Sequence, residues 1–149
     1  MRAAVLRTAG EPVTIENVDV DDPAPGEVLI RTTAAGVCHS DLHFIEGLYD
    51  TAMPCVPGHE SAGIVEAVGD GVSYVAPGDH VITCMSAFCG VCRNCTAGRP
   101  VLCESKETWR APGQPPRLSQ HGEPFTQLYN LGSYAEQMLV HEHLFGVGA

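Results

Sequence analysis

Basic residues are scarce in this chain of 149 residues. It has 8 lysines and arginines against 18 aspartates and glutamates, which gives a formal net charge of −10 at pH 7. No cluster of lysine or arginine is available to replace the counterions of a phosphate backbone, so a nucleic-acid partner is not expected. Long apolar runs are also lacking, and we expect no membrane span. The absence of a secretory signal pattern, together with thiols that are not arranged for disulfides, predicts a reducing cytoplasm.

The chain also lacks a dinucleotide-binding fingerprint. No G-x-G-x-x-G follows a strand-like segment and opens a helix, and the run Gly69-Asp70-Gly71 does not have that spacing. An apolar fraction of 44% is ordinary for a soluble domain with a real core. We therefore expect one domain over residues 1–149, with no Rossmann cofactor domain in it.

What the sequence does contain is a series of short β-branched or alternating runs separated by glycine, proline and aspartate, a pattern typical of strands and turns. The expected strands are 2–7, 13–18, 27–35, 63–68, 80–84 and 134–140. One short helix is expected over 39–47. From 86 to about 130 the pattern is lost, and we expect a cysteine lobe followed by a long polar excursion that a metal anchors at its root. The sequence predicts a mainly β fold with short helices, a small and partly open barrel.

Four of the seven cysteines stand at close, repeated spacing, C-x2-C-x2-C-x7-C. They are Cys89, Cys92, Cys95 and Cys103. The spacing suits one tetrahedral zinc ion, and four thiolates leave that ion no open position, so we expect a structural site. Iron or an iron–sulfur cluster is an alternative that ligand softness does not exclude. Disulfides are disfavoured because the count is odd and the spacing is metal-like. Cys55 and Cys84 fall outside both metal-ligand sets and are expected to be buried, unreactive thiols.

A second set has mixed ligands. Cys38, His59 and Glu60 combine a thiol, an imidazole and a carboxylate, and each stands beside other polar residues. Catalytic zinc sites keep one coordination position open, and this mixed character predicts a catalytic site. The other histidines without metal-like spacing are His80, His121, His141 and His143. We expect these to be ordinary surface or core residues, and we expect Phe125 and Tyr129 to serve packing.

These motifs together resemble a known family. The segment Gly58-His59-Glu60-Ser61-Ala62-Gly63, followed by Gly69 and Val72, resembles the zinc signature of the zinc-dependent medium-chain alcohol dehydrogenases, as do Cys38-His39-Ser40-Asp41-Leu42-His43 and the four-cysteine lobe. The resemblance covers the whole chain, but only the N-terminal, GroES-like catalytic domain of that family. It implies a GroES-like barrel with its zinc lobe and excursion over about 86–130, and a cofactor domain that belongs to a longer chain.

The resemblance also implies ligand roles. Cys38 and His59 would be ligands of a catalytic zinc, with the third ligand beyond residue 149. Glu60 would be an alternative ligand or a carboxylate close to the metal. Asp41 would bind the second ring nitrogen of His59 and so fix its tautomer and orientation.

Three further residues of the same helix receive roles from the resemblance. Ser40 would take the proton of the substrate alcohol, and His43 would pass that proton to solvent. His39 stands where many members carry an arginine that holds the pyrophosphate of the nicotinamide cofactor. A histidine would hold it less firmly, and faster cofactor release is the expected consequence.

The function implied by the resemblance is zinc-dependent, NAD(P)-linked oxidation of a small alcohol to an aldehyde, by a homodimer or homotetramer. Primary or aromatic alcohols are expected, while Glu60 keeps the polyol and threonine branches open. The isolated chain is expected to be inactive because no hydride acceptor is bound to it. Two alternatives are a non-enzymatic, zinc-stabilised GroES-like binding module and an iron-binding electron carrier.

Overall fold

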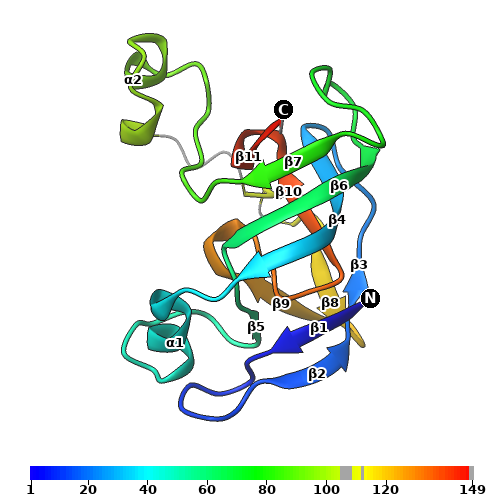
Figure 1. Ribbon diagram of the computed structural model, residues 1–149, viewed down its shortest axis with the longest axis vertical. Helices are drawn as coiled ribbons and strands as arrows, with labels where there is room; N and C mark the ends of the chain where they lie inside the picture. Colours follow the sequence, from blue (N-terminus) through cyan, green and yellow to red (C-terminus); the bar gives the residue numbers. More distant parts are fainter. Residues whose placement is uncertain (105–108, 112, 148–149) are drawn as a thin grey trace.

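The computed structural model describes residues 1–104, 109–111 and 113–147 (Figure 1). Its strands are β1 Arg2–Val5, β2 Thr14–Asn17, β3 Asp19–Val20, β4 Glu27–Gly36, β5 Cys55–Val56, β6 Glu60–Val68, β7 His80–Thr83, β8 Leu118–Gln120, β9 Glu123–Gln127, β10 Gln137–His141 and β11 Phe145–Val147. Its helices are α1 His39–Ile45 and α2 Arg93–Thr96, with the 3-10 turns η1 Pro100–Leu102, η2 Leu128–Asn130 and η3 Glu142–Leu144.

A five-stranded antiparallel sheet in the order β10-β4-β6-β7-β11 forms the centre of the molecule. In β4, Val28 and Ile30 are fully buried while Arg31 is exposed, as the two-residue period of a half-buried strand requires. Burying one such side chain stabilises the fold by about 1.5–3 kcal/mol. The core on this sheet consists of Val28, Ile30, Val65, Val75, Val81, Leu131, Met138, Val140, Leu144 and Phe145.

Two smaller sheets pack a second core. One pairs β1 with β2, and the other has the order β3-β8-β9-β5, in which β5 and β9 run parallel. The residues of this core are Ala3, Val5, Val18, Val56, Leu118 and Phe125. Over the described residues the sheets do not join into one closed ring, and this agrees with the partly open barrel expected from the sequence.

The expected strands and helix are confirmed, with ends shifted by a few residues. The start of β6 is shifted from Gly63 to Glu60, immediately after His59, and the start of β10 is shifted from Tyr134 to Gln137. Three short strands were not anticipated outside the excursion, namely β3, β5 and β11. Each has two or three residues, too few to show an alternating pattern. Cys55 is buried as expected, but Cys84 is exposed and that expectation was wrong, because it lies just past the end of β7.

The excursion is more regular than expected. The expectation of no regular structure between 86 and about 130 is wrong, since β8 and β9 form an antiparallel hairpin there. Leu118 and Phe125 face each other across the hairpin and fill the second core. The signal was hidden because β8 has three residues and Pro124 interrupts β9.

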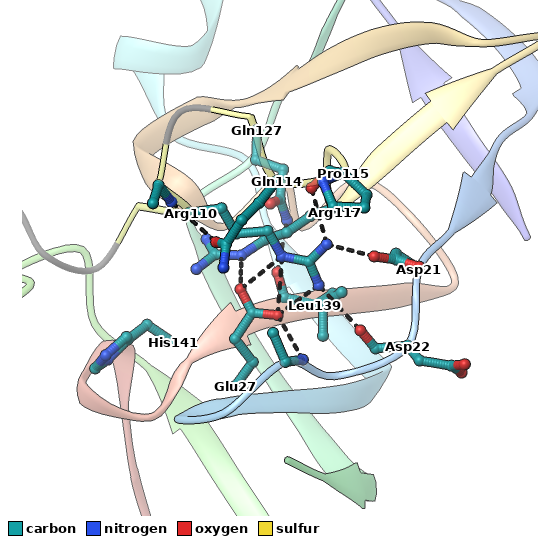
Figure 2. Close-up of polar contacts among 12 residues, drawn as sticks. Asp21, Asp22, Glu27, Arg110, Gln114, Pro115, Arg117, Gln127, Leu139 and His141 are labelled. Carbon is teal, nitrogen blue, oxygen red and sulfur yellow. Dashed lines mark hydrogen bonds and ion pairs between the residues drawn. The ribbon is translucent and has the colours of Figure 1, made fainter. Parts of the chain in front are cut away.

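A buried carboxylate anchors the excursion to β4. Figure 2 shows the guanidinium groups of Arg110 and Arg117 converging on Glu27, which is only 3% exposed. Arg110 Nη2 and Arg117 Nε each lie 2.7 Å from a different oxygen of that carboxylate. Arg110 also pairs with Asp21. Burial alone would raise the pKa of Glu27, but the hydrogen bonds from Arg110 and Arg117 outweigh it and the pKa lies below its ordinary value.

Figure 1 places α1 beyond one end of β4 and sets α2 apart from the strands. The short helix α1 therefore lies where β4 ends and β6 begins. No helix in residues 1–104, 109–111 and 113–147 combines the length and the apolar character needed to cross a membrane.

Candidate metal centres

The pairing of β4 with β6 brings the mixed-ligand set together. Cys38 lies between the end of β4 and the start of α1, and the antiparallel register places Gly36 opposite Glu60. One ligand atom from each of Cys38, His59 and Glu60 lies within 4.8 Å of the others. Residues separated by about twenty positions in sequence thus offer a sulfur, a nitrogen and an oxygen to one point in space.

Gly36 makes room for the Glu60 carboxylate. A Cβ atom at position 36 would lie 2.6 Å from Glu60 Oε2, closer than a van der Waals contact allows. Glu60 is the exposed member of the set, while His59 is buried. The carboxylate can therefore reach the thiol and the imidazole from the solvent side.

Asp41 holds His59 from the buried side. The Asp41 side chain is fully buried, and its Oδ1 lies 2.9 Å from Nδ1 of His59, so the expected contact is present. An ionised carboxylate only accepts hydrogen bonds, so Nδ1 donates and Nε2 keeps its lone pair for a ligand. The backbone N–H groups of Cys38 and Gly58 also donate to this carboxylate, each at 3.2 Å.

Ser40 stands between the thiol and the imidazole. Its Oγ lies 3.2 Å from Cys38 Sγ and 3.5 Å from His59 Nε2. Its hydroxyl is therefore on the side of the site that faces the ligand atoms, and not on the Asp41 side. A hydroxyl can both accept and donate a proton, which is what a proton relay at this point requires.

Two further histidines of α1 lie next to each other. The ring centroids of His39 and His43 are 4.7 Å apart, and Tyr49 packs edge-on against His43 at 5.2 Å. His39 is exposed, whereas His43 Nδ1 is buried and has no hydrogen-bond partner among the described residues. The two adjacent histidines thus differ in exposure, with His39 the more exposed.

Two tyrosines complete the surroundings of His59. Tyr134 Oη donates to Asp41 Oδ2 at 2.8 Å. Burial and the hydrogen bond to Asp41 raise the pKa of Tyr134, which keeps its proton and remains a donor. The ring of Tyr129, expected to serve packing, lies edge-on to the His59 ring with centroids 5.1 Å apart. Sequence reasoning missed Tyr134 because the contact joins residues 93 positions apart and no local pattern signals it.

The four lobe cysteines also converge. Their sulfur atoms lie within 4.8 Å of one another, with Cys92 Sγ 3.5 Å from Cys95 and 4.0 Å from Cys103. Four thiolates at the Zn–S bond length of about 2.3 Å stand roughly 3.8 Å apart in a tetrahedron, so the geometry fits the ion. The backbone N–H of Cys92 also donates to Cys89 Sγ at 3.3 Å, as expected around metal-bound sulfur.

The electrostatics of the lobe also favour a cation. The backbone N–H groups of Cys95 and Glu104 lower the pKa of Cys92 to about 6. Burial and the hydrogen bond with Cys92 raise the pKa of Cys95 to about 11. One thiolate forms readily and its neighbour then resists ionisation, so a bound cation is what would let all the sulfurs ionise.

The remaining histidines lie outside both metal-ligand groups found among the described residues. His143 supports the root of the lobe, where its Nδ1 lies 2.6 Å from the carbonyl oxygen of Phe88 and the two rings stack. Burial and the neighbouring His143 lower the pKa of His141 to about 4, so it is uncharged near neutrality. Both therefore have packing roles.

The sequence profile of the family described as alcohol dehydrogenase GroES-like domain matches residues 24–147. The chain belongs to this family.

Curated relatives of this alcohol dehydrogenase domain are longer enzymes. It is 43% identical over 145 residues to the NDMA-dependent alcohol dehydrogenase of Amycolatopsis methanolica, covering 95% of this chain and 39% of that one. It is 41% identical over 146 residues to the S-(hydroxymethyl)glutathione dehydrogenase of Haemophilus influenzae, again covering 95% and 39%. The chain thus spans about two-fifths of the length of these relatives.

A solved structure shows the same fold as this alcohol dehydrogenase domain. The alcohol dehydrogenase zinc-binding domain protein from Burkholderia ambifaria superposes with a TM-score of 0.88 at 37% identity, over 99% of this chain and 41% of that chain. The GroES-like fold expected from the sequence is confirmed.

Proposed function

We propose that this domain supplies the catalytic metal ligands and the proton path of a longer, NAD(P)-linked alcohol dehydrogenase acting on primary or aromatic alcohols. The observation that carries the proposal is the convergence of Cys38, His59 and Glu60 within 4.8 Å. Ser40 Oγ lies beside the first two of these. A non-enzymatic module has no use for a hydroxyl and a buried carboxylate arranged around such a set.

The names of the relatives support the proposed reaction class. One is an alcohol dehydrogenase and another acts on S-(hydroxymethyl)glutathione, so both are named for the oxidation of a hydroxyl group. By the same reasoning we propose that the isolated domain, without a hydride acceptor, is inactive. Seven free thiols support a reducing cytoplasm as the location. Association as a homodimer or homotetramer is proposed from the resemblance alone.

The chain's own residues would position the alcohol and move its proton. Zinc held at this site would supply the Lewis acidity that favours the ionised form of an alcohol. Asp41 fixes the His59 ring so that Nε2 faces the ligand cluster. Ser40 would accept the proton of the alcohol, and His43 would carry it toward solvent, because both belong to α1 and lie one turn apart.

Glu60 gives a second possible ligand set. Its carboxylate lies within 4.8 Å of the Cys38 and His59 ligand atoms, which favours Glu60 as a third protein ligand within this domain. A site of that composition would extend the proposal to polyol or threonine substrates, the two branches that the family resemblance leaves open.

Replacing Cys38 with serine tests the proposed function. In the full-length enzyme we expect two zinc ions per chain, and Cys38→Ser should remove one of them and lower kcat/KM by at least about a hundredfold. The measurements are metal content by plasma mass spectrometry and NAD(P)-dependent alcohol oxidation. Retention of both zinc ions and of full activity in Cys38→Ser would contradict the proposal, and iron in place of zinc would favour an electron carrier.

His39→Arg tests the proposed cofactor contact. A guanidinium group binds pyrophosphate through several charge-assisted hydrogen bonds, so the full-length variant should bind NAD(P)H about five- to tenfold more tightly and release it more slowly. His80→Arg, an exposed substitution of the same kind on β7, is the matched control and should leave the affinity unchanged. Stopped-flow release of the cofactor is measured for both variants. An unchanged affinity in His39→Arg would contradict a contact between residue 39 and the cofactor.

A further inference from the structure

The carboxylate that orients His59 is itself held at two separate oxygens. Oδ1 of Asp41 accepts from the His59 ring at 2.9 Å and from the Gly58 backbone at 3.2 Å. Oδ2 accepts from the Cys38 backbone at 3.2 Å and from the Tyr134 hydroxyl at 2.8 Å. The torsion that turns an aspartate carboxylate is broad, so these donors decide its orientation. The shorter of the two bonds to Oδ2 comes from Tyr134.

Tyr134 is held in place by the same turn that carries His59. Its backbone N–H donates to the Pro57 carbonyl at 3.0 Å, and the Ser133 N–H donates to the Gly58 carbonyl at 3.1 Å. Gly58 has φ of 93°, and a Cβ atom there would lie 2.5 Å from Tyr134 Cδ1. The glycine therefore serves both the left-handed backbone and the close approach of the ring.

The contact also joins elements that are distant in sequence. Asp41 belongs to α1, and the carbonyl of Tyr134 accepts from the Ala4 N–H of β1 at 2.7 Å. The tyrosine thus connects the first strand, the helix that follows Cys38 and the turn that precedes His59. Because Tyr134 is fixed by these β elements, it can restrict the motion of the His59 imidazole.

We propose that Tyr134 is a positioning residue of the candidate catalytic site, whose hydroxyl fixes the Asp41 carboxylate and thereby holds His59 with Nε2 facing Cys38 and Glu60. The inference rests on the proposed function, in which His59 is a ligand of the catalytic metal and its orientation therefore matters. Groups that hydrogen-bond to a ligand histidine through a carboxylate orient the ring and raise metal affinity. Tyr134 acts through Asp41, whose carboxylate accepts the hydrogen bond of its hydroxyl.

The test is Tyr134→Phe in the full-length enzyme, which removes one hydroxyl and keeps the ring. We expect the zinc that depends on Cys38 to bind about tenfold more weakly, measured by competition with a chelator. Cobalt(II) put in place of that zinc should show an altered visible absorption spectrum, which reports ligand geometry independently of activity. Zinc affinity within about twofold of wild type, with an unchanged cobalt spectrum, overturns the inference.

Tyr74→Phe is the matched control. The Tyr74 hydroxyl donates to the carbonyl of Glu142 in η3, outside both metal-ligand groups, so this variant also loses one phenolic hydrogen bond. It should lower stability without changing the affinity for zinc. An equal loss of zinc affinity in both variants would mean that Tyr134 has a merely structural effect, and would overturn the inference.

Asp41→Asn tests the step through Asp41 directly. Asp41→Asn should weaken zinc binding at least as much, because an amide can donate to Nδ1 and favour the tautomer whose Nε2 carries the proton. Adding Tyr134→Phe to Asp41→Asn should then change the affinity by less than about twofold. Wild-type affinity in Asp41→Asn overturns the inference, whereas a wild-type enzyme without any zinc dependent on Cys38 overturns the proposed function itself.

Discussion

Replacing Glu27 with glutamine is expected to lower the free energy of unfolding by about 3–5 kcal/mol, because the variant leaves buried guanidinium charge without its carboxylate. The Arg110 and Arg117 side chains are only 9% and 7% exposed, so solvent cannot replace the lost charge. Arg110 retains Asp21 as a partner, so the loss at its guanidinium group is only partial. Urea unfolding followed by circular dichroism and by the fluorescence of the only tryptophan, Trp109, measures the loss.

The position of Trp109 makes the fluorescence informative about the excursion. Trp109 is next to Arg110 and is 53% exposed, so release of the segment from β4 should change its emission before the five-stranded sheet unfolds. Glu136→Gln is the matched control, because it removes a carboxylate from an ion pair with Arg2 whose side chains are 70% and 49% exposed. That variant should lose less than about 1 kcal/mol. Similar losses in the two variants would contradict the anchoring role of Glu27.

Glu27→Gln should also alter the acid sensitivity of the domain. Because the pKa of Glu27 is lowered in the folded state, its contribution to stability is present above the ordinary glutamate pKa of about 4.3 and is lost as the pH falls through the folded value. Wild type should therefore lose stability more steeply than Glu27→Gln below about pH 4. Parallel profiles for the two proteins would mean that the buried pair contributes nothing to acid sensitivity.

Four of the five strands of the central sheet and both ligand sets could be predicted because their signals are local. The alternation around Val28 and Ile30 marks β4, and the spacing from Cys89 to Cys103 marks the lobe. His59 and Glu60 were found through a motif that resembles a family. Local patterns of this kind carry fold information wherever an element is long enough to repeat its period.

The parts that were missed depend on contacts between distant residues. Glu27 meets Arg117 across 90 positions, and no local pattern distinguishes these charges from others on a surface. The hairpin of β8 and β9 becomes stable by filling a core that other segments build. Tyr134 was assigned to a strand, but its side chain reaches α1 instead. Register and tertiary packing decide such contacts, and a single sequence specifies them only through the whole fold.

Replacing Cys89 with serine is expected to remove one zinc ion and to unfold the lobe while the sheets remain folded. Neither α2 nor η1 contains a buried residue, and Val91 and Val101 are 76% and 73% exposed. The lobe therefore has no apolar core of its own, and metal–thiolate bonds must supply its stability. Amide hydrogen exchange over 89–103 should become at least about a hundredfold faster, whereas exchange in β4 and β6 should stay within about threefold of wild type.

Cys84→Ser is the matched control for this lobe, because Cys84 is an exposed thiol outside both ligand groups. It should leave zinc content and hydrogen exchange unchanged. Loss of exchange protection throughout the five-stranded sheet in Cys89→Ser would show that the lobe and the barrel form one cooperative unit, against the expectation. An unchanged zinc content in Cys89→Ser would contradict a four-thiolate site. The two readouts together therefore separate the role of Cys89 as a metal ligand from the effect of the metal on the rest of the fold.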